Sequence, residues 1–442
     1  MCEVEPTLEA QLSEIKTLNI NKDLDESTYE AAKPTLLILP VEILLKICSF
    51  LEADFLKFTL SKVCRRFEDI LADDHLWKYW VHSKINGLYP VLPNLTLWEE
   101  TPIDWVGVCV EMDVERKKWI NVKDTMNHIV IKDVHYASVD TVLLANRGEV
   151  CLSGGRDRCM ALWHVEDIQI CENTDKTEIR EVKPRFIKTD AHGGWVWDLA
   201  ADNIENASVF YSASWDSTVK AWDLESGLKC IETFKCGMSA LSLVTSDNLV
   251  MAGLFSKKIL SFDLRTGPNP INSYKPHKGP VLGLNSYKNM VASLSEDKTL
   301  AIWDRVAGKL MQNEINIPTE RAYPVRINWC SSALYISDSK GSLHLFNPEN
   351  HAFVRTHDIW PESSIMEPSN KIVGCYQSEG NLILCSDRGE MKFLYNCYPP
   401  QQYASVKTRT IDVTQLRYHD GVLVIGTCDA TLEMWIPKKR YN

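Results

Sequence analysis

Three groups of residues in this sequence carry the side chains of a hydrolytic triad: a histidine, then a serine, then an aspartate. In a Ser-His-Asp hydrolase the histidine takes the serine proton and the aspartate holds the histidine. Here, however, the group occurs three times at similar spacings, and a tryptophan follows each aspartate after five intervening residues (Asp-x₅-Trp). A repeated structural unit therefore explains the pattern better than catalysis does. The groups are His135, Ser153, Asp157 and Trp163; His192, Ser212, Asp216 and Trp222; and His277, Ser293, Asp297 and Trp303.

The tryptophan of each group belongs to a longer series of aromatic positions. After Trp222 the equivalent positions follow at steps of 40, 41 and 43 residues, which reach Phe346. The series ends at Trp435, which again belongs to an Asp-x₅-Trp. A unit of this length, with an acid in a turn and a tryptophan on a strand, is typical of one blade of a β-propeller. The series predicts seven blades. Its positions are Trp163, Trp222, Phe262, Trp303, Phe346, Phe393 or Tyr395, and Trp435.

The two ends of the repeat predict how the ring closes. The seventh unit ends at Pro437, directly after its third expected strand. The segment HIVIKDV, residues 128–134, precedes the first unit and can supply the missing outer strand. We therefore expect the first strand to join the last blade, which removes the free edges of the ring.

A segment of a different kind precedes the repeats, at residues 36–80. Pro40 suits the first turn of a helix, and Asp54 suits the N-cap of a second one. Two or three helices of this length form only a thin core, so we expect apolar residues to remain for a partner. The first apolar stripe is Ile43, Leu44, Ile47 and Leu51, and the second is Leu56, Leu60, Val63, Phe67 and Leu71.

This segment resembles an F-box, and the chain from residue 36 onwards resembles the F-box/WD-repeat family. The F-box resemblance rests on Leu39-Pro40, Glu42-Ile43-Leu44, Val63-Cys64-Arg65 and Leu76-Trp77. The family resemblance rests on YPVLP (89–93), HYASVDTVLLANRGEVCLSGGRDR (135–158), HGGWVWDLA (192–200) and SASWDSTVKAWD (212–223).

The resemblance implies a fold, partners and roles for residues. An F-box docks on the SKP-type adaptor of a cullin-RING (SCF) ubiquitin ligase, so the chain would be the substrate-recognition subunit and would itself do no chemistry. The alternative is a scaffold that engages partners without directing degradation. In similar propellers the repeated tetrads are buried chains in which tryptophan donates to serine, histidine bridges and aspartate fixes the histidine. The implied adaptor-binding residues are Leu39, Pro40, Ile43, Leu44, Ile47, Leu51, Val63, Cys64 and Trp77.

The blade pattern also indicates where a substrate would bind. One face of such a ring carries the residues directly before and after the first valine of each blade, and the residue before the turn aspartate. In the first three blades these positions gather large aromatic residues and an arginine, which are typical of binding hot spots. An apolar or aromatic peptide anchor suits them better than a phosphate, although Trp197 also suits the core between blades. The predicted substrate-binding residues are Trp195, Trp197, Trp215, Arg156, Phe255 and Arg326.

Composition narrows the remaining possibilities. The net charge of −11 argues against a nucleic-acid surface. No run of 18 apolar residues suggests a membrane span, and the N-terminal residues lack the apolar core of a signal peptide. The 14 cysteines show no zinc spacing and are expected to be reduced, in the cytoplasm or the nucleus. We find no nucleotide, cofactor or hydrolase motif, and expect no cofactor.

The expected fold is therefore mainly β: a seven-bladed WD-repeat β-propeller preceded by a small all-α F-box and a helical linker. The expected domains are an acidic disordered segment (1–33), the F-box (34–82), the linker (83–120) and the propeller (121–442).

Overall fold

The structure is a computed structural model that describes residues 36–92, 103–169, 182–246, 248–319, 322–330, 333–360 and 370–438. The predicted acidic segment, residues 1–33, lies outside the described residues. The chain divides into two compact units, which meet in sequence between Leu51 and Glu52. Within the described ranges, no helix is long and apolar enough to cross a membrane.

The first unit contains a short 3₁₀ helix, η1 (Leu36–Ile38), and the helix α2 (Val41–Cys48). Pro40 stands at the N-cap of α2, one residue before the helical turns, where its missing N–H leaves no bond unmade. The helix ends at Ser49, whose backbone N–H still donates to the carbonyl of Leu45.

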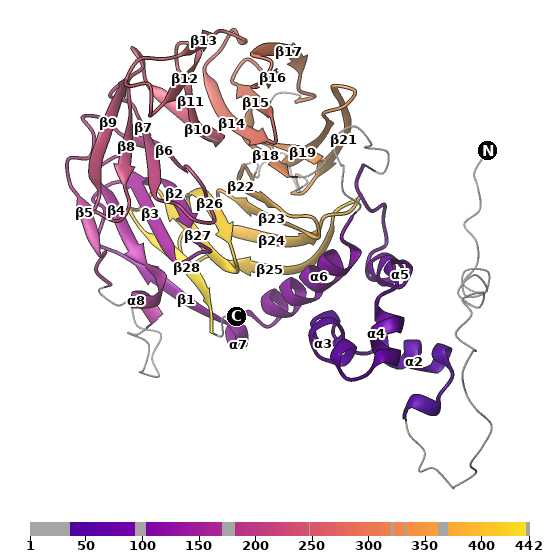
Figure 1. The fold of residues 1–442 in the computed structure, drawn as a ribbon. Helices are drawn as coiled ribbons and strands as arrows, with labels where there is room; N and C mark the ends of the chain where they lie inside the picture. The colour runs from indigo at the N-terminus through magenta and orange to yellow at the C-terminus, as the bar shows by residue number, and fades with distance from the viewer. Residues whose placement is uncertain are drawn as a thin grey trace, which may run out of the picture. The chain divides into compact units, whose positions relative to one another are not determined.

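The second unit is dominated by seven four-stranded antiparallel sheets arranged around a central channel (Figure 1). The innermost strands are β2 (Val139–Ala145), β6 (Val196–Ala201), β10 (Ala240–Ser246), β14 (Val281–Tyr287), β18 (Pro324–Cys330), β22 (Ile372–Gln377) and β26 (Val413–His419). The second strands are β3 (Val150–Gly155), β7 (Val209–Ser214), β11 (Leu249–Leu254), β15 (Met290–Ser295), β19 (Ala333–Asp338), β23 (Asn381–Ser386) and β27 (Val422–Thr427). The third strands are β4 (Met160–His164), β8 (Thr218–Asp223), β12 (Ile259–Asp263), β16 (Thr299–Asp304), β20 (Ser342–Asn347), β24 (Glu390–Tyr395) and β28 (Leu432–Pro437). The outer strands are β5 (Phe186–Lys188), β9 (Lys229–Lys235), β13 (Asn272–Tyr274), β17 (Lys309–Asn316), β21 (Ala352–Asp358), β25 (Gln401–Lys407) and β1 (Met126–Ile131).

The ring closes as the sequence predicted. Strand β1 pairs antiparallel with β28, with Met126 opposite Pro437 and His128 opposite Trp435. Beyond the strand, the backbone N–H of Lys438 donates to the carbonyl of Thr125 (2.8 Å). The last blade is thus built from both ends of the propeller sequence, which confirms the predicted closure.

Apolar residues fill the spaces between adjacent blades. Trp222 is buried in one cluster with Leu143 and Leu152 of the preceding blade. In blade 6 the strand pairing puts Leu394 opposite Leu382, at the position that Trp222 holds opposite Phe210. The predicted substitutes, Phe393 and Tyr395, are therefore the two neighbours of the equivalent residue. The reason is that leucine fills this gap between blades, so the aromatic signal used to count the repeat is lost there.

The second unit begins with short helices. They are α3 (Ala53–Phe58), η2 (Leu60–Lys62), α4 (Arg65–Leu71) and α5 (Asp74–Lys84). The single predicted stripe from Leu56 to Leu71 is thus divided among three helices, and Val63 lies between two of them, 64% exposed. Glu52, not Asp54, is the N-cap of α3; the carboxylate of Asp54 instead accepts from the N–H of Phe55.

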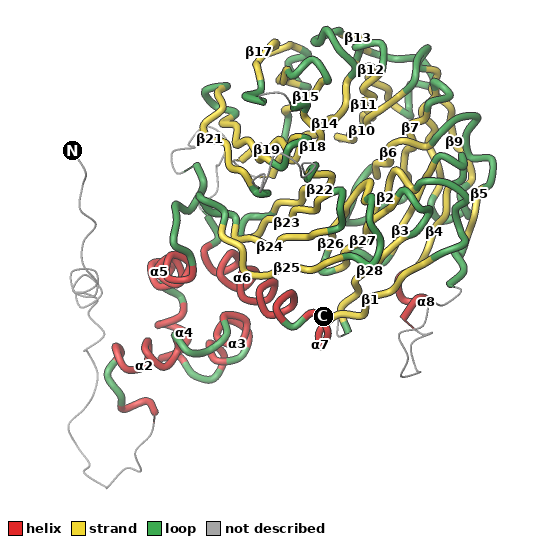
Figure 2. The backbone as a smooth tube through the Cα atoms, turned by 180° about the vertical axis from the view of Figure 1, so that it is seen from behind, coloured by secondary structure: helices red, strands yellow, loops and turns green. Residues whose placement is uncertain are grey.

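A linker helix, α6 (Trp105–Ile120), runs from these helices to the propeller and is followed by α7 (Val122–Thr125); both views show it beside β25 (Figures 1 and 2). Asp113 accepts from the backbone N–H of Ala53 (3.1 Å) and pairs with Lys84. At the other end, Trp119 stacks on Phe393 of blade 6 with 4.0 Å between ring centroids. The short helices of this unit, α6 and blade 6 are therefore joined by direct side-chain contacts. The buried residues of α6 are Val108, Cys109, Met112, Glu115 and Trp119.

Candidate binding surfaces

The first unit presents apolar side chains to solvent. On α2, Ile43 is 48% exposed whereas Leu44, the next residue, is 1% exposed. Phe50, just after the helix, is 76% exposed. Exposed side chains of this size have no role in a core, so they mark this short segment as a candidate contact surface. The exposed apolar residues of the unit are Leu36, Ile38, Ile43, Phe50 and Leu51.

The first helices of the second unit carry exposed apolar residues of their own. Phe55 and Phe58 on α3 and Val63 after η2 are all exposed. Trp77 on α5 differs, because it is fully buried and its indole N–H donates to the carbonyl of Leu71 (2.8 Å). Trp77 therefore supports the helices and offers no surface.

The predicted adaptor-binding residues thus fall into three groups. Pro40, Ile43, Leu51 and Val63 are exposed; Leu39, Ile47 and Cys64 are half-buried; Leu44 and Trp77 are buried. The prediction missed Leu36, Ile38, Phe50, Phe55 and Phe58, which are exposed. These residues lie outside the regular helical stripe, and their apolar character alone does not tell whether they are exposed.

In the propeller, all seven blades build one face in the same way. The backbone N–H of the residue after the second strand donates to the carbonyl of the residue before the first strand, as from Trp215 to Trp195 (3.0 Å). A β-bulge after the first residue of each innermost strand turns the next side chain toward this face. We call these three positions in each blade the rim. In blades 1 to 5 they are Ser138, Asp140 and Arg156; Trp195, Trp197 and Trp215; Ser239, Leu241 and Phe255; Pro280, Leu282 and Glu296; and Tyr323, Val325 and Ser339.

Four of the predicted substrate-binding residues form one aromatic cluster on the rim. The ring centroids of Trp195 and Trp197 lie 6.4 Å apart, and Trp215 lies 5.6 Å from each. Phe255 of blade 3 extends the cluster, 6.1 Å from Trp215. Trp195 is 41% exposed, Trp215 36% and Phe255 44%, and Trp197 is half-buried. The cluster is therefore a surface feature and not part of the core between blades.

Arg156 of blade 1 lies beside this cluster, held by two kinds of contact. Its Nε donates to Oδ2 of Asp140 (3.0 Å), and its Nη2 donates to Oδ1 (3.3 Å). Its guanidinium carbon lies 5.0 Å from the ring centroid of Trp195. Burial raises the pKa of Asp140, and the bonds from Arg156 act against that rise. Asp140 is thus the residue that fixes Arg156, a role that the sequence did not reveal.

Arg326 does not lie on the rim, contrary to the prediction. Pro324 opens the innermost strand of blade 5, as Val196 does in blade 2, so Arg326 comes two residues later and faces the channel. Its Nε and Nη2 donate to the carbonyls of Val373 and Thr414, both 2.9 Å away. Val373 and Thr414 are the bulged residues of blades 6 and 7, whose carbonyls the strand ladder leaves for such a donor.

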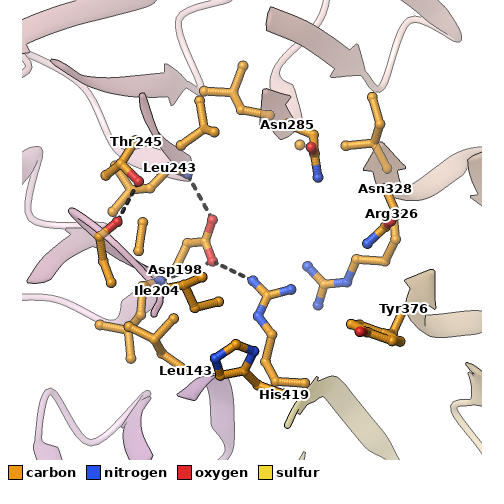
Figure 3. Close-up of a pocket in the computed structure, with 18 of the residues that line it drawn as sticks. Leu143, Asp198, Ile204, Leu243, Thr245, Asn285, Arg326, Asn328, Tyr376 and His419 are labelled. Atoms are coloured by element: carbon orange, nitrogen blue, oxygen red, sulfur yellow. Dashed lines mark hydrogen bonds and ion pairs between the residues drawn. The ribbon is translucent and has the colours of Figure 1, made fainter. Parts of the chain in front are cut away.

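The channel contains a cavity of about 990 Å³ lined by residues of the innermost strands (Figure 3). Asp198 and Arg326 point into it from opposite sides. Asp198 accepts from the N–H of Leu243 (2.8 Å) and lies 3.7 Å from the guanidinium of Arg417. Burial, followed by the nearby charge of Arg417, lowers the pKa of Arg326 to about 10. The principal charges in this part of the channel therefore already have partners.

The histidine groups form buried networks, but the three networks differ. In blade 2, His192 bonds Asp216 through Nδ1 (2.9 Å) and Ser212 through Nε2 (2.6 Å), and Trp222 donates to Ser212 (2.7 Å). All four predicted members are connected there, and the set contains no exposed nucleophile.

Blades 1 and 4 depart from this arrangement. In blade 1, His135 bonds Asp157 (2.8 Å) and Ser153 (2.6 Å), but the buried indole N–H of Trp163 has no hydrogen-bond partner. The tryptophan relay expected from the resemblance is therefore missing there.

In blade 4, Nδ1 of His277 bonds the hydroxyl of Thr299 (2.7 Å), which donates to Asp297. Nδ1 of His277 and Oδ1 of Asp297 are 3.8 Å apart, which is too far for a direct hydrogen bond. The hydroxyl of Ser293 contacts His277 (2.8 Å) and the carbonyl of Ala301, while Trp303 packs on the ring of Tyr274. A threonine thus replaces the direct His–Asp contact.

A short helical segment with exposed apolar residues and a seven-bladed β-propeller define a class of protein that joins a small helical module to a propeller in one chain. Comparison with known proteins agrees. Residues 36–81 match the family described as F-box-like, and residues 184–223 and 268–304 match the WD domain, G-beta repeat. Each WD match spans the outer strand of one blade (β5 or β13) and the first three strands of the next, blade 2 or blade 4.

Full-length relatives combine the same two parts. Human F-box/WD repeat-containing protein 9 is 30% identical over 91% of this chain and 83% of its own length. The protein of the same name from Bos taurus is 31% identical, with the same coverage. F-box/WD repeat-containing protein mec-15 of Caenorhabditis elegans is 29% identical over 92% of this chain and 97% of its own length. The chain therefore belongs to the F-box/WD-repeat family.

Proposed function

We propose that this protein is the substrate-recognition subunit of an SCF-type cullin-RING ubiquitin ligase. Its F-box segment would dock on an SKP-type adaptor, and its propeller would hold a protein substrate for ubiquitination by a partner enzyme. The observation that carries the proposal is that one chain combines an F-box-like segment rich in exposed apolar residues with a propeller whose rim bears an exposed aromatic cluster. The chain would work by binding and would have no catalytic residues of its own.

The adaptor half of the proposal rests on exposed side chains that a partner must cover. Changing Ile43 and Phe50 together to alanine removes two such anchors and leaves the buried Leu44 in place. Because apolar anchors at the centre of an interface each contribute about 2 kcal/mol or more, capture of purified SKP-type adaptor should fall by about a hundredfold or more. Glu42→Ala, at an exposed position of the same helix, is the matched control and should bind normally. Unchanged capture by the double variant would refute the F-box role.

The substrate half is tested in cells. Proteins captured with the wild-type chain should be reduced about tenfold with Trp215→Ala or Arg156→Glu, while adaptor capture and melting temperature stay unchanged. If the chain is a recognition subunit, those proteins should accumulate when it is removed, and proteasome inhibition should abolish the difference. Partners that are captured but never accumulate would favour the alternative, a scaffold that does not direct degradation.

A further inference from the structure

The aromatic cluster on the rim offers both ring faces and ring edges to a ligand. Trp195 and Trp197 are nearly parallel (20°), and Trp215 stands at 60° and 72° to them. Rings in this relation can contact a large side chain from more than one direction, as aromatic pairs in cores do. Met238, which directly precedes the rim residue Ser239 of blade 3, is also exposed.

The arginine of this surface is already neutralised. A phosphate is best recognised by an arginine whose parallel N–H groups are available to its oxygens. The Nε and Nη2 groups of Arg156 donate hydrogen bonds to Asp140, whose side chain is only 7% exposed. The guanidinium of Arg156 also lies over the ring of Trp195. A phosphate could reach only the remaining N–H groups of Arg156, and it would lie close to the Asp140 carboxylate, which offsets the positive charge that attracts it. The Nε and Nη2 groups of Arg326 likewise donate hydrogen bonds, to backbone carbonyls in the channel.

Other cations flank the cluster. The turn of blade 1 carries the exposed Arg158, and the turn of blade 3 carries Lys257 and the exposed Lys258. The acids of the neighbouring turns, Asp157 and Asp216, are hydrogen-bonded to His135 and His192 and have lowered pKa values, so they remain negatively charged. An exposed carboxylate, Asp190, lies in the loop before blade 2. The turn of blade 3 therefore carries a net positive charge, whereas in the turn of blade 1 the charge of Arg158 is balanced by Asp157.

We propose that the rim of blades 1–3 recognises an unphosphorylated linear segment of its partner, with one large apolar residue seated on Trp195, Trp197 and Trp215 and a carboxylate beside it facing Lys257 and Lys258. This inference rests on the proposed function, because it names the substrate class of that receptor. The apolar anchor supplies most of the affinity, and the flanking charges supply orientation and a faster encounter.

The test uses the full chain bound to its adaptor and an array of synthetic 12-residue peptides. The central residue of each peptide is Trp, Leu or Ala, and the flanking positions are Glu, Lys, Ser or phosphoserine. Peptides with a Trp or Leu centre and Glu flanks should bind at least about tenfold better than those with Ala centres or Lys flanks. Trp215→Ala should abolish this preference. Tyr323→Ala is the matched control, since Tyr323 has the rim position of Trp195 in blade 5 and is similarly exposed (46%).

A charge reversal sharpens the test. Lys257→Glu combined with Lys258→Glu should shift the preferred flanks from Glu toward Lys without changing the preferred centre. Binding that requires phosphoserine, or that survives Trp215→Ala but not Tyr323→Ala, overturns the inference. Absence of any Trp215-dependent peptide also overturns it, even if the adaptor still binds. Failure of adaptor binding alone would instead refute the ligase role and leave the peptide preference standing.

Discussion

Blades 2 and 4 begin from the same four residue types and differ in what they do with them. In blade 2 histidine bonds aspartate directly, and tryptophan donates to serine. In blade 4 a threonine hydroxyl stands between histidine and aspartate, and the serine bonds a backbone carbonyl. Their rims differ more: three tryptophans in blade 2 face solvent where blade 4 has Pro280, Leu282 and Glu296. The comparison shows that the two blades keep a buried pattern of the same residue types while the residues of the rim beside it differ.

The largest expected effect comes from removing the turn aspartate in the two blades. Asp216→Ala deletes an acceptor for His192, Gly193 and Thr218, and leaves Nδ1 of the buried His192 without its main partner. We expect it to lower the free energy of unfolding by about 3 kcal/mol. Asp297→Ala should cost about 1 kcal/mol less, because His277 keeps its bond to Thr299. Melting temperatures of the two variants measure the difference.

If the two aspartate variants lose the same free energy of unfolding, the threonine bridge of blade 4 does not contribute to stability. Substrate and adaptor capture should remain normal in whatever fraction of each variant is folded, because neither aspartate belongs to the rim. Loss of one binding partner at normal stability would mean that the aspartate acts as a surface contact.

A smaller effect should come from the threonines themselves. Thr299→Val removes the hydroxyl that joins His277 to Asp297, whereas Thr218→Val leaves His192 bonded to Asp216. We expect Thr299→Val to lower the free energy of unfolding by about 1–2 kcal/mol and Thr218→Val by less than about 1 kcal/mol. Urea unfolding of both variants is the measurement, and the reverse order would contradict the two networks as described.

The smallest effect should appear on mild acidification. Burial lowers the pKa of both His192 and His277, and the aspartate of each pair opposes that shift. The folded state then binds fewer protons than the unfolded chain below about pH 6.5, so stability should fall as the pH drops from about 7 to 5. His192→Asn should flatten this part of a plot of melting temperature against pH. A wild-type melting temperature that rises over the same interval would contradict the argument.

The sequence predicted the repeated parts of the fold well, because a blade is a local pattern of a turn acid, a strand aromatic and alternating apolar residues. The closure by β1 followed from the missing strand after Pro437. The helix boundaries near Val63 did not follow, since the apolar stripe continues at helical spacing through a break in the backbone. Arg326 was placed wrongly because blade 5 opens on Pro324, so Val325 is the second residue of the strand and not the first, and Arg326 lies one position beyond the rim.

Partners within the candidate site were also hidden from sequence reasoning. The ion pair between Asp140 and Arg156 forms only when the fold brings these two residues, 16 apart in sequence, side by side. The exposure of Phe50, Phe55 and Phe58 depends on which faces of short helices are covered, and spacing alone does not decide this. The aromatic cluster was predictable because its members occupy the three rim positions of the blade pattern.

The pairing of β1 with β28 has a consequence for the order of events during synthesis. Residues 126–131 are synthesised about 300 residues before β28, the strand with which they pair. Trp119 is likewise synthesised long before Phe393 of blade 6, on which it stacks. The linker helix and the first strand therefore complete their contacts only after the final residues of the propeller have been made. A chain that ended before β28 would carry an F-box-like segment without a closed ring behind it, because β1 would have no strand to pair with.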